Sequence, residues 1–212
     1  MNSNEIYTAQ TWPELMTACA KTQDYLLKSV LDLKYSLERR RHHTLIRSMS
    51  GRLKARDSIH AKLIRLKLEP TPQNASRELH DIAGIRIICS YLQDVRDVLD
   101  ELNHIDHLKI LEVKDYITHP KPSGYRSLHV VGLCDISGKN TLCEIQLRTT
   151  AMDSWASLEH EMRYKKDLPQ SDYVNKGLLD VSALLFESDC RMEQLHLYLE
   201  NRRTPDSAHS DS

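Results

Sequence analysis

Several features that mark particular classes of protein are scarce or missing in this sequence of 212 residues. One Phe and six Gly exclude an RNA-recognition sheet rich in aromatic residues and a glycine-rich chain of low complexity. No run of residues approaches the roughly 20 apolar residues of a membrane span, and the first ten residues have neither the basic nor the apolar part of a signal peptide. We therefore expect a cytoplasmic protein that is neither exported nor inserted in a membrane.

Cysteine is present, but its number and spacing favour neither disulfides nor zinc. The five cysteines are odd in number, widely spaced and never arranged as Cys-x-x-Cys; they are Cys19, Cys89, Cys134, Cys143 and Cys190. We expect reduced thiols that lie mostly in the interior, where free cysteine is common.

The chain also lacks a net charge of either sign, since 29 basic and 30 acidic residues give a formal charge of -1. This balance hides a segregation along the sequence. Residues 34–67 contain eleven Lys or Arg and only two acids, Glu38 and Asp57, so that this segment carries +9 and the remainder -10. Positive charge concentrated in one segment of a neutral protein is a candidate binding surface for a polyanion.

Hydrophobic spacing and turn residues divide the chain into helices at both ends and strands in the middle. We predict helices over 11–47 (one or two), 57–68 with Asp57 as N-cap, 94–102, 151–165 and from Pro169 to about 201, and strands over 82–90, 108–116, 125–134 and 141–149. Pro70 and Pro72 end the second helix. The prediction is an α+β fold with a mixed central sheet of about five strands flanked by helices, forming a single domain over 1–203, with a disordered polar tail at 204–212.

The basic segment contains one helix face suited to phosphates. On the predicted helix Ser58, Lys62 and Arg65 follow the spacing i, i+4, i+7 and share a face, while an apolar stripe of Ile59, Leu63 and Leu66 lies about 100° away. Together with Arg52 and Lys54, these cations and one hydroxyl suit a triphosphate, although RNA or another polyanion would satisfy the same charge.

Two predicted strands carry polar residues on one face. Alternation places Glu144, Gln146 and Arg148 on one side of their strand, opposite Cys143, Ile145 and Leu147, and aligns Tyr125, Ser127 and His129 on the neighbouring strand. These side chains offer a ring for stacking, a base and hydrogen-bond donors. Asp81 opens the first buried strand, where its carboxylate could join Glu144 at a hard cation such as Mg²⁺.

Five motifs resemble those of the RelA/SpoT family of (p)ppGpp synthetases, and they follow one another along the chain in the order that the family has. The loop Lys121-Pro122-Ser123-Gly124-Tyr125-Arg126-Ser127-Leu128-His129 is similar to the guanine-nucleotide loop of that family. The other four are Arg52-x-Lys54-x-x-x-Ser58-x-x-x-Lys62, Asp81-Ile82-Ala83-Gly84-Ile85-Arg86, Glu144-Ile145-Gln146-Leu147-Arg148-Thr149 and Trp155-Ala156-Ser157-Leu158-Glu159-His160. The resemblance covers residues 47–165, which is the catalytic region of the family.

The resemblance implies a reaction and a role for each matching residue. The enzyme would transfer the β,γ-pyrophosphate of ATP to the 3′-hydroxyl of GDP or GTP, release AMP and use Mg²⁺. Arg52 and Arg86 would clasp the adenine, and Lys54, Ser58, Lys62 and Arg65 would hold the phosphates of ATP. Asp81 and Glu144 would be the catalytic carboxylates and the metal ligands, Glu144 either sharing the metal or accepting the 3′-hydroxyl proton. The acceptor nucleotide would be bound by Lys121, Ser123, Tyr125, His129, Gln146, Arg148 and Glu159, with Tyr125 stacked on guanine.

The sequence departs from the longer members of the family in two respects. Ser123 stands where they often have Asn, which leaves the preference among GDP, GTP and GMP open. The bifunctional members also carry a metal-dependent hydrolase with spaced His-Asp pairs, whereas the His-Asp pair here, His80-Asp81, belongs to the strand entry. We therefore expect a single-domain small alarmone synthetase whose output is set by expression, oligomerisation and small-molecule effectors.

Three other functions compete with this one. A general nucleotidyltransferase would need a Gly-Ser followed by Asp-x-Asp or Asp-x-Glu, which no predicted strand offers. A toxin-type relative that pyrophosphorylates the 3′ end of tRNA could use the run Arg39–Arg41 to hold RNA. A silent RNA-binding or partner-binding module would not require Asp81, Tyr125, His129 and Glu144 together.

The last predicted helix has more leucine and valine than one face needs against a small sheet. These residues are Leu178, Leu179, Val181, Leu184, Leu185, Leu195, Leu197 and Leu199. Packing against a second copy would bury the surplus, and the resemblance to the short family members implies a homotetramer. Packing within a single chain is the alternative.

Overall fold

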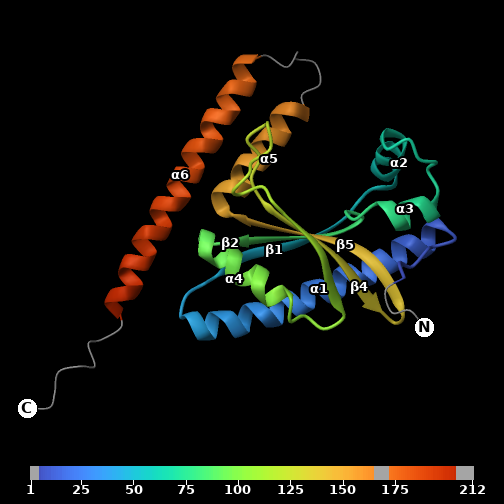
Figure 1. The fold of residues 1–212 in the computed structure, drawn as a ribbon, viewed down its shortest axis with the longest axis horizontal. Coiled ribbons are helices and arrows are strands. Elements are labelled where there is room, and N and C mark those ends of the chain that lie inside the picture. The colour runs from blue at the N-terminus through green and yellow to red at the C-terminus, as the bar shows by residue number, and fades with distance from the viewer. Residues whose placement is uncertain (1–4, 165–171, 204–212) are drawn as a thin grey trace, which may run out of the picture.

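Helices from both ends of the chain flank a five-stranded mixed sheet in the computed structural model, which describes residues 5–164 and 172–203 (Figure 1). The strands are β1 (Ile46–Leu53), β2 (Ala83–Cys89), β3 (Leu108–Asp115), β4 (Leu128–Ile136) and β5 (Lys139–Thr149), in the order β1-β2-β5-β4-β3. The central pair β2 and β5 is parallel, and all other pairs are antiparallel. The predicted fold class is confirmed.

The helices are α1 (Trp12–Arg41), α2 (Arg56–Arg65), α3 (Pro72–Glu78), α4 (Leu92–Leu102), α5 (Thr150–Tyr164) and α6 (Asp172–Arg203). Helices α1 and α4 pack along one side of the sheet, whereas α5 and α6 pack against each other (Figure 1). Alternate residues of the central strands, among them Ile85, Ile145 and Leu147, are fully or almost fully buried in the core. The intervening residues of β5 therefore face the opposite side of the sheet, where polar side chains are free to form a site.

The first helix ends earlier than its hydrophobic spacing predicts. It starts at a capping box, in which Thr11 and Glu14 satisfy each other's backbone amides, and it ends at His42, whose φ of 57° is left-handed. The following residues form strand β1, which the sequence did not reveal. Ile46, Met49 and Leu53 follow a three- and four-residue spacing typical of a helix, because a bulge between residues 46 and 48 interrupts the alternation of the strand.

Two further boundaries differ from the prediction around the basic helix. The N-cap of α2 is Ala55, and Asp57 lies in its first turn. Pro72 does not end a helix but begins α3, after Thr71, whose hydroxyl accepts a hydrogen bond from the amide of Asn74. Of the expected apolar stripe Ile59 and Leu63 are completely buried, but Leu66 lies beyond the last turn and is 47% exposed.

Strand β4 starts later than the sequence predicts. Strand β4 begins at Leu128, so that Tyr125 belongs to the preceding loop. Four cysteines are buried and Cys190 is half-buried, all of them free thiols as expected. Within the described ranges, none of the helices combines the length and the apolar character that crossing a bilayer requires. The predicted tail at 204–212 lies outside the described residues.

Candidate active site

A cleft of about 310 Å³ opens on the polar side of the sheet, beside three adjacent strands. It is lined by Ser50, Arg52, Lys54, Asp81, Gly84, Ile85, Arg86, Glu144 and Gln146. The pairing of the strands explains this grouping, because Arg52 lies opposite Gly84, and Gly84 opposite Glu144. A side chain at Gly84 would place its Cβ 3.3 Å from the Arg52 carbonyl oxygen, so glycine leaves room between these strands.

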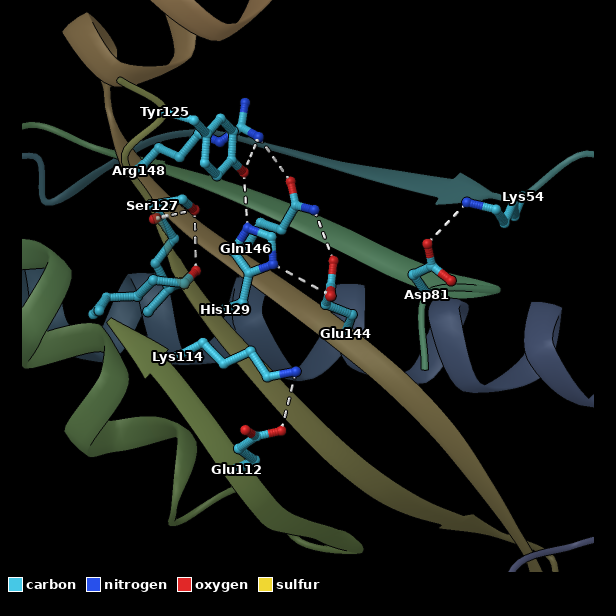
Figure 2. A network of polar contacts seen from close by, with 12 residues as sticks. Lys54, Asp81, Glu112, Lys114, Tyr125, Ser127, His129, Glu144, Gln146 and Arg148 are labelled. Carbon is cyan, nitrogen blue, oxygen red and sulfur yellow. Dashed lines mark hydrogen bonds and ion pairs between the residues drawn. The ribbon is translucent and has the colours of Figure 1, made fainter. Parts of the chain in front are cut away.

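One half of the cleft is built from two lysines around a carboxylate. The Nζ atoms of Lys54 and Lys62 each donate a hydrogen bond of 2.8 Å to Asp81, one to each carboxylate oxygen; Figure 2 shows the bond from Lys54. Partial burial acts to raise the pKa of Asp81, but the two lysines outweigh it and hold that pKa below its ordinary value. Asp81 is therefore ionised, and two cations around one acid leave a net positive charge for an anionic ligand.

A row of hydrogen-bonded side chains from β4, β5 and the loop before β4 adjoins the cleft through Glu144 and Gln146 and forms the other half of the site. The Tyr125 hydroxyl lies 2.8 Å from Nε2 of His129, and Nδ1 of His129 lies 3.3 Å from the Glu144 carboxylate (Figure 2). Gln146 donates a bond of 2.7 Å to the other oxygen of Glu144. Burial acts to raise the pKa of Glu144, yet the bonds from His129 and Gln146 hold it below the ordinary value.

Arg148 connects this row to the first turn of α5. Its Nη2 donates to the Tyr125 hydroxyl at 2.7 Å and to the side-chain oxygen of Gln146 at 2.9 Å, and its Nη1 donates to Asp153 at 2.9 Å. The sequence patterns did not indicate Asp153. The signal that could have found it is an acid in the first turn of a helix that directly follows the motif strand, where the helix dipole favours a negative charge.

An aromatic pair with a lysine between its rings borders the same row. Nζ of Lys121 lies 4.6 Å from the ring centre of Tyr116 and 4.9 Å from that of Tyr125. The Tyr116 ring also contacts His129 edge-on, at 5.2 Å between ring centres. Partial burial, together with Lys114, Arg148 and Lys62, lowers the pKa of Lys121, while Glu144 acts against this shift. Tyr116 was also missed, because its position at the end of a predicted strand carried no motif.

The structure joins most of the predicted site residues into this cleft and its two adjoining networks. Four of them lie at other positions of the fold. Ser58 and Arg65 are exposed on α2, one turn before and after Lys62. Ser123 shapes its own loop, since its hydroxyl accepts a bond of 3.4 Å from the Tyr125 amide. Glu159 lies six residues beyond Asp153 on α5, about 9 Å along the helix axis.

One predicted alignment is wrong. Ser127 was expected beside Tyr125 and His129 on the polar face, but it is fully buried and donates a hydrogen bond of 3.0 Å to the carbonyl of Leu147. Because β4 begins only at Leu128, the alternation of the strand does not extend back to residues 125 and 127. Tyr125 reaches the site from the loop instead.

The two carboxylates of the cleft fit a magnesium ion that arrives with a nucleotide. Mg²⁺ takes oxygen ligands and is commonly held by one or two carboxylates together with substrate phosphates. Asp81 and Glu144 line one cleft and influence each other electrostatically. Within residues 5–164 and 172–203 no group of three or more His, Cys, Asp or Glu could hold a metal alone. Phosphate oxygens would have to complete the coordination.

The cleft has lysines and arginines around two carboxylates, and next to it lie aromatic rings that can stack on a base. This composition is typical of a nucleotide-binding enzyme that handles phosphate groups. The model of the region found in RelA/SpoT proteins matches residues 51–168, which is more than half of the chain and includes nearly the whole cleft. The chain belongs to the RelA/SpoT family.

Two bacterial proteins of similar size are close relatives. The GTP pyrophosphokinase YwaC of Bacillus subtilis (strain 168) is 42% identical over 151 residues, which are 66% of this chain and 72% of YwaC. The GTP pyrophosphokinase YjbM of the same organism is 33% identical over 158 residues, or 73% of this chain and 74% of YjbM. The resemblance seen in the sequence to small alarmone synthetases is confirmed by these matches.

Solved structures agree with this assignment. A GTP pyrophosphokinase family protein from Streptococcus pneumoniae superposes with a TM-score of 0.80 at 31% identity, over 90% of this chain and 95% of that one. Small alarmone synthetase 1 from Bacillus subtilis, bound to its product pppGpp, gives a TM-score of 0.71 at 32% identity, over 82% and 90% of the two chains. The same enzyme bound to AMPCPP gives 0.74 at 27% identity, over 90% and 98%.

Proposed function

We propose that this protein transfers the β,γ-pyrophosphate of ATP to the 3′-hydroxyl of GDP or GTP, with release of AMP, to make the alarmones ppGpp and pppGpp. The observation that carries the proposal is that one cleft holds both a cationic half, around Asp81, and an oriented carboxylate, Glu144, beside aromatic rings. Relatives named GTP pyrophosphokinases, and a related structure bound to pppGpp, support the same reaction.

The cationic half would bind ATP. Arg52 and Arg86 lie on neighbouring strands and could clasp the adenine from two sides, as the family motif implies. Lys54 and Lys62 would exchange their bonds to Asp81 for bonds to the phosphates, with Ser58 and Arg65 on the same face of α2 extending this surface. Attack on the β-phosphorus develops negative charge on phosphate oxygens and on the leaving AMP, which fixed cations stabilise.

Magnesium would be held by Asp81 and Glu144 together with phosphate oxygens. When bound, it neutralises charge on the transferred pyrophosphate. The protein's own share is to keep both carboxylates ionised before the ligands bind, which the lysines achieve for Asp81 and which His129 and Gln146 achieve for Glu144.

The acceptor nucleotide would lie against the other half of the cleft. Guanine would stack on Tyr125, and the acceptor phosphates and ribose would meet Lys121 and His129, supported by Ser123, Gln146, Arg148 and Glu159. As the alternative to holding magnesium, Glu144 would receive the proton of the 3′-hydroxyl. A carboxylate with a lowered pKa is a weak base, so alignment of the hydroxyl with the phosphorus contributes more to the rate than proton affinity does.

The test is a direct assay of products. Purified protein with Mg²⁺, ATP and GDP or GTP should form AMP and a guanosine nucleotide that carries a 3′-pyrophosphate, separated by ion-exchange chromatography. AMP that forms only after tRNA is added would instead establish the tRNA-modifying function. For that alternative, RNA would have to compete with Glu101 and Asp97 of α4, which form ion pairs of 2.5 and 2.6 Å with Arg40 and Arg41.

We also propose that copies of this chain associate through α6. Leu184, Leu195 and Leu199 on this helix are each more than half exposed. Between α5 and α6 an open apolar cavity of about 600 Å³ is lined by residues that include Trp155, Met162 and Tyr173. Apolar surface of this extent on a folded chain is typical of an interface between subunits.

A further inference from the structure

A single carboxylate oxygen connects the two halves of the cleft. Oδ1 of Asp153 accepts a hydrogen bond of 2.9 Å from Nη1 of Arg148 and forms an ion pair of 3.3 Å with Nη1 of Arg86. Arg86 lies on β2 and lines the proposed ATP half. Arg148 lies on β5 and bonds to Tyr125 and Gln146 in the proposed acceptor half. No motif of the family resemblance assigned a role to Asp153.

The backbone that carries Asp153 is fixed on both sides. Helix α5 follows β5 without an intervening loop, and Thr149 caps it by accepting a bond of 3.2 Å from the Met152 amide. Thr149 itself donates a bond of 2.6 Å to Asp189 of α6. Further along, the Trp155 ring nitrogen donates to the Leu178 carbonyl at 2.9 Å. A carboxylate on such a support can define where two long arginine side chains stand.

Electrostatics gives both arginines a reason to need this carboxylate. The side chain of Arg148 is only 5% exposed, and the Nε atoms of Arg86 and Arg148 are buried without a hydrogen-bond partner. Burial lowers the pKa of Arg86, the nearby Arg148 lowers it further, and Asp153 acts in the opposite direction. Two neighbouring guanidinium groups, that of Arg148 buried and that of Arg86 half-buried, repel each other unless an anion lies between them.

We propose that Asp153 is a positioning residue that sets the relative place of Arg86 and Arg148 and thereby couples ATP binding to acceptor binding. The proposal rests on the proposed function for the assignment of the two halves. Asp153 performs no chemistry; its loss would let Arg86 turn away from the adenine and would release Arg148 from the ring of Tyr125.

The test is Asp153→Asn, which keeps the shape of the side chain and removes its charge. The dissociation constants of AMPCPP and of GDP, measured separately by calorimetry, should each rise about tenfold, since each arginine loses a charge-assisted bond. If Asp153 acted only through its negative charge, both dissociation constants would instead fall, because removing a negative charge from an anion-binding cleft strengthens the binding of both ligands. Glu161→Gln, the same change of charge at an exposed position of α5, should alter neither constant.

Three further measurements distinguish the positioning role of Asp153 from a purely structural one. If Asp153→Asn lowers the melting temperature but leaves both constants unchanged, or weakens only one ligand, the coupling is refuted. Should the Asn variant fail to fold, Asp153→Glu retains the charge one methylene away and should weaken both ligands by about threefold. In a double-mutant cycle Asp153→Asn and Arg86→Gln should be non-additive for AMPCPP. Failure of the proposed function would appear separately, as absence of AMP formation by the wild-type protein that binds both nucleotides.

Discussion

Glu144 is a half-buried carboxylate whose surroundings act on its pKa in opposite directions. Burial favours the neutral acid, and the nearby Asp81 adds to this, whereas His129 and Gln146 stabilise the anion. The hydrogen bonds prevail, so Glu144 is ionised near neutral pH and is fixed in orientation by two partners. A fixed carboxylate suits a role in aligning the acceptor hydroxyl, which Ala or Gln at this position would remove.

Substitution of Glu144 should therefore separate binding from turnover. In Glu144→Gln we expect kcat to fall about 10²- to 10⁴-fold, the usual contribution of a positioned proton acceptor. The dissociation constant of AMPCPP, measured without Mg²⁺, should change less than about twofold, because the bonds of Lys54 and Lys62 do not involve Glu144. Rapid-quench assays of AMP formation and calorimetry measure the two quantities. A parallel loss of AMPCPP binding would show that the ATP half is wrongly assigned.

The pH dependence of activity follows from the same opposing effects on the pKa of Glu144. Because the pKa of Glu144 lies below its ordinary value of 4.5, activity should persist at mildly acidic pH and be lost only as the pH falls through that lowered pKa. His129→Leu removes one stabilising partner while burial remains, so the acidic limb should move to higher pH. The measurement is kcat against pH, with circular dichroism at each pH to confirm folding. An unchanged acidic limb would mean that His129 does not control this group.

Tyr125 is expected to act on the acceptor alone. Stacking of a base on an aromatic ring contributes about 1–3 kcal/mol, so Tyr125→Ala should raise the KM for GDP roughly 10-fold or more. The KM for ATP should change little, since the Tyr125 hydroxyl bonds to His129 and Arg148, which both belong to the acceptor half. Tyr125→Phe, which retains the ring, is the matched control and should keep most of the acceptor affinity. Equal effects of Tyr125→Ala on both nucleotides would contradict the allocation.

At the scale of elements, the sequence predicted β2, β3, β4 and β5 and missed the edge strand β1. Strands β2 and β5 have dense apolar runs or clear alternation, because one or both faces are covered. Both β1 and β3 are edge strands with a bulge, but β3 has four apolar residues close together, whereas the three of β1, Ile46, Met49 and Leu53, stand at helical spacing. Helix α3 was hidden by a proline that begins it. Local sequence patterns do not specify which segments pair or pack together, and these tertiary contacts decide the structure of segments such as β1 and α3.

The residues of the candidate site likewise divide into those that a local pattern predicts and those that it misses. Glu144, Gln146 and Arg148 could be grouped from the period of a single strand, and the structure bonds them in that order. Asp153 and Tyr116 belong to the site only because α5 turns back over β5 and because β3 ends beside the loop before β4. Contacts between segments of this kind depend on tertiary packing, which neither spacing nor composition specifies.

The loop that carries Tyr125 is held by α6 at one glycine. Gly124 has a φ of 91°, and a Cβ there would lie 3.0 Å from Cβ of Ser182. Gly124→Ala should therefore displace the loop and raise the KM for GDP several-fold, with little effect on ATP. Gly138→Ala is a matched control, because Gly138 also has a positive φ, 76°, but its Cβ would meet nothing within 4 Å. Steady-state kinetics of both variants, with their melting temperatures, would separate crowding of the loop from backbone strain. A similar effect of both would mean that α6 does not position the loop.

For the molecule as a whole, charge is divided between binding and packing. Part of the basic segment serves the cleft: Arg52 and Lys54 line it, and Lys62 joins Lys54 in an ion pair with Asp81. Another part, Arg40 and Arg41 at the end of α1, pairs with acids of α4 and joins two elements of the fold. A net charge near zero is therefore compatible with a strongly positive site, since the compensating acids lie elsewhere on the chain.

The exposed apolar face of α6 predicts that the protein is an oligomer in solution. Leu184 is 65% exposed and Leu195 is 58% exposed, and they lie about three turns apart on one face. Burying each leucine at an interface would contribute about 1.5–3 kcal/mol, so replacing both by Glu should favour dissociation strongly. Sedimentation should show the wild-type protein as an oligomer and Leu184→Glu/Leu195→Glu as a 24.5 kDa monomer. Ile64→Glu makes the same chemical change on α2, at a residue that is also 65% exposed, and should leave the oligomer intact. A wild-type protein that sediments as a monomer would show that α6 does not assemble copies of this chain.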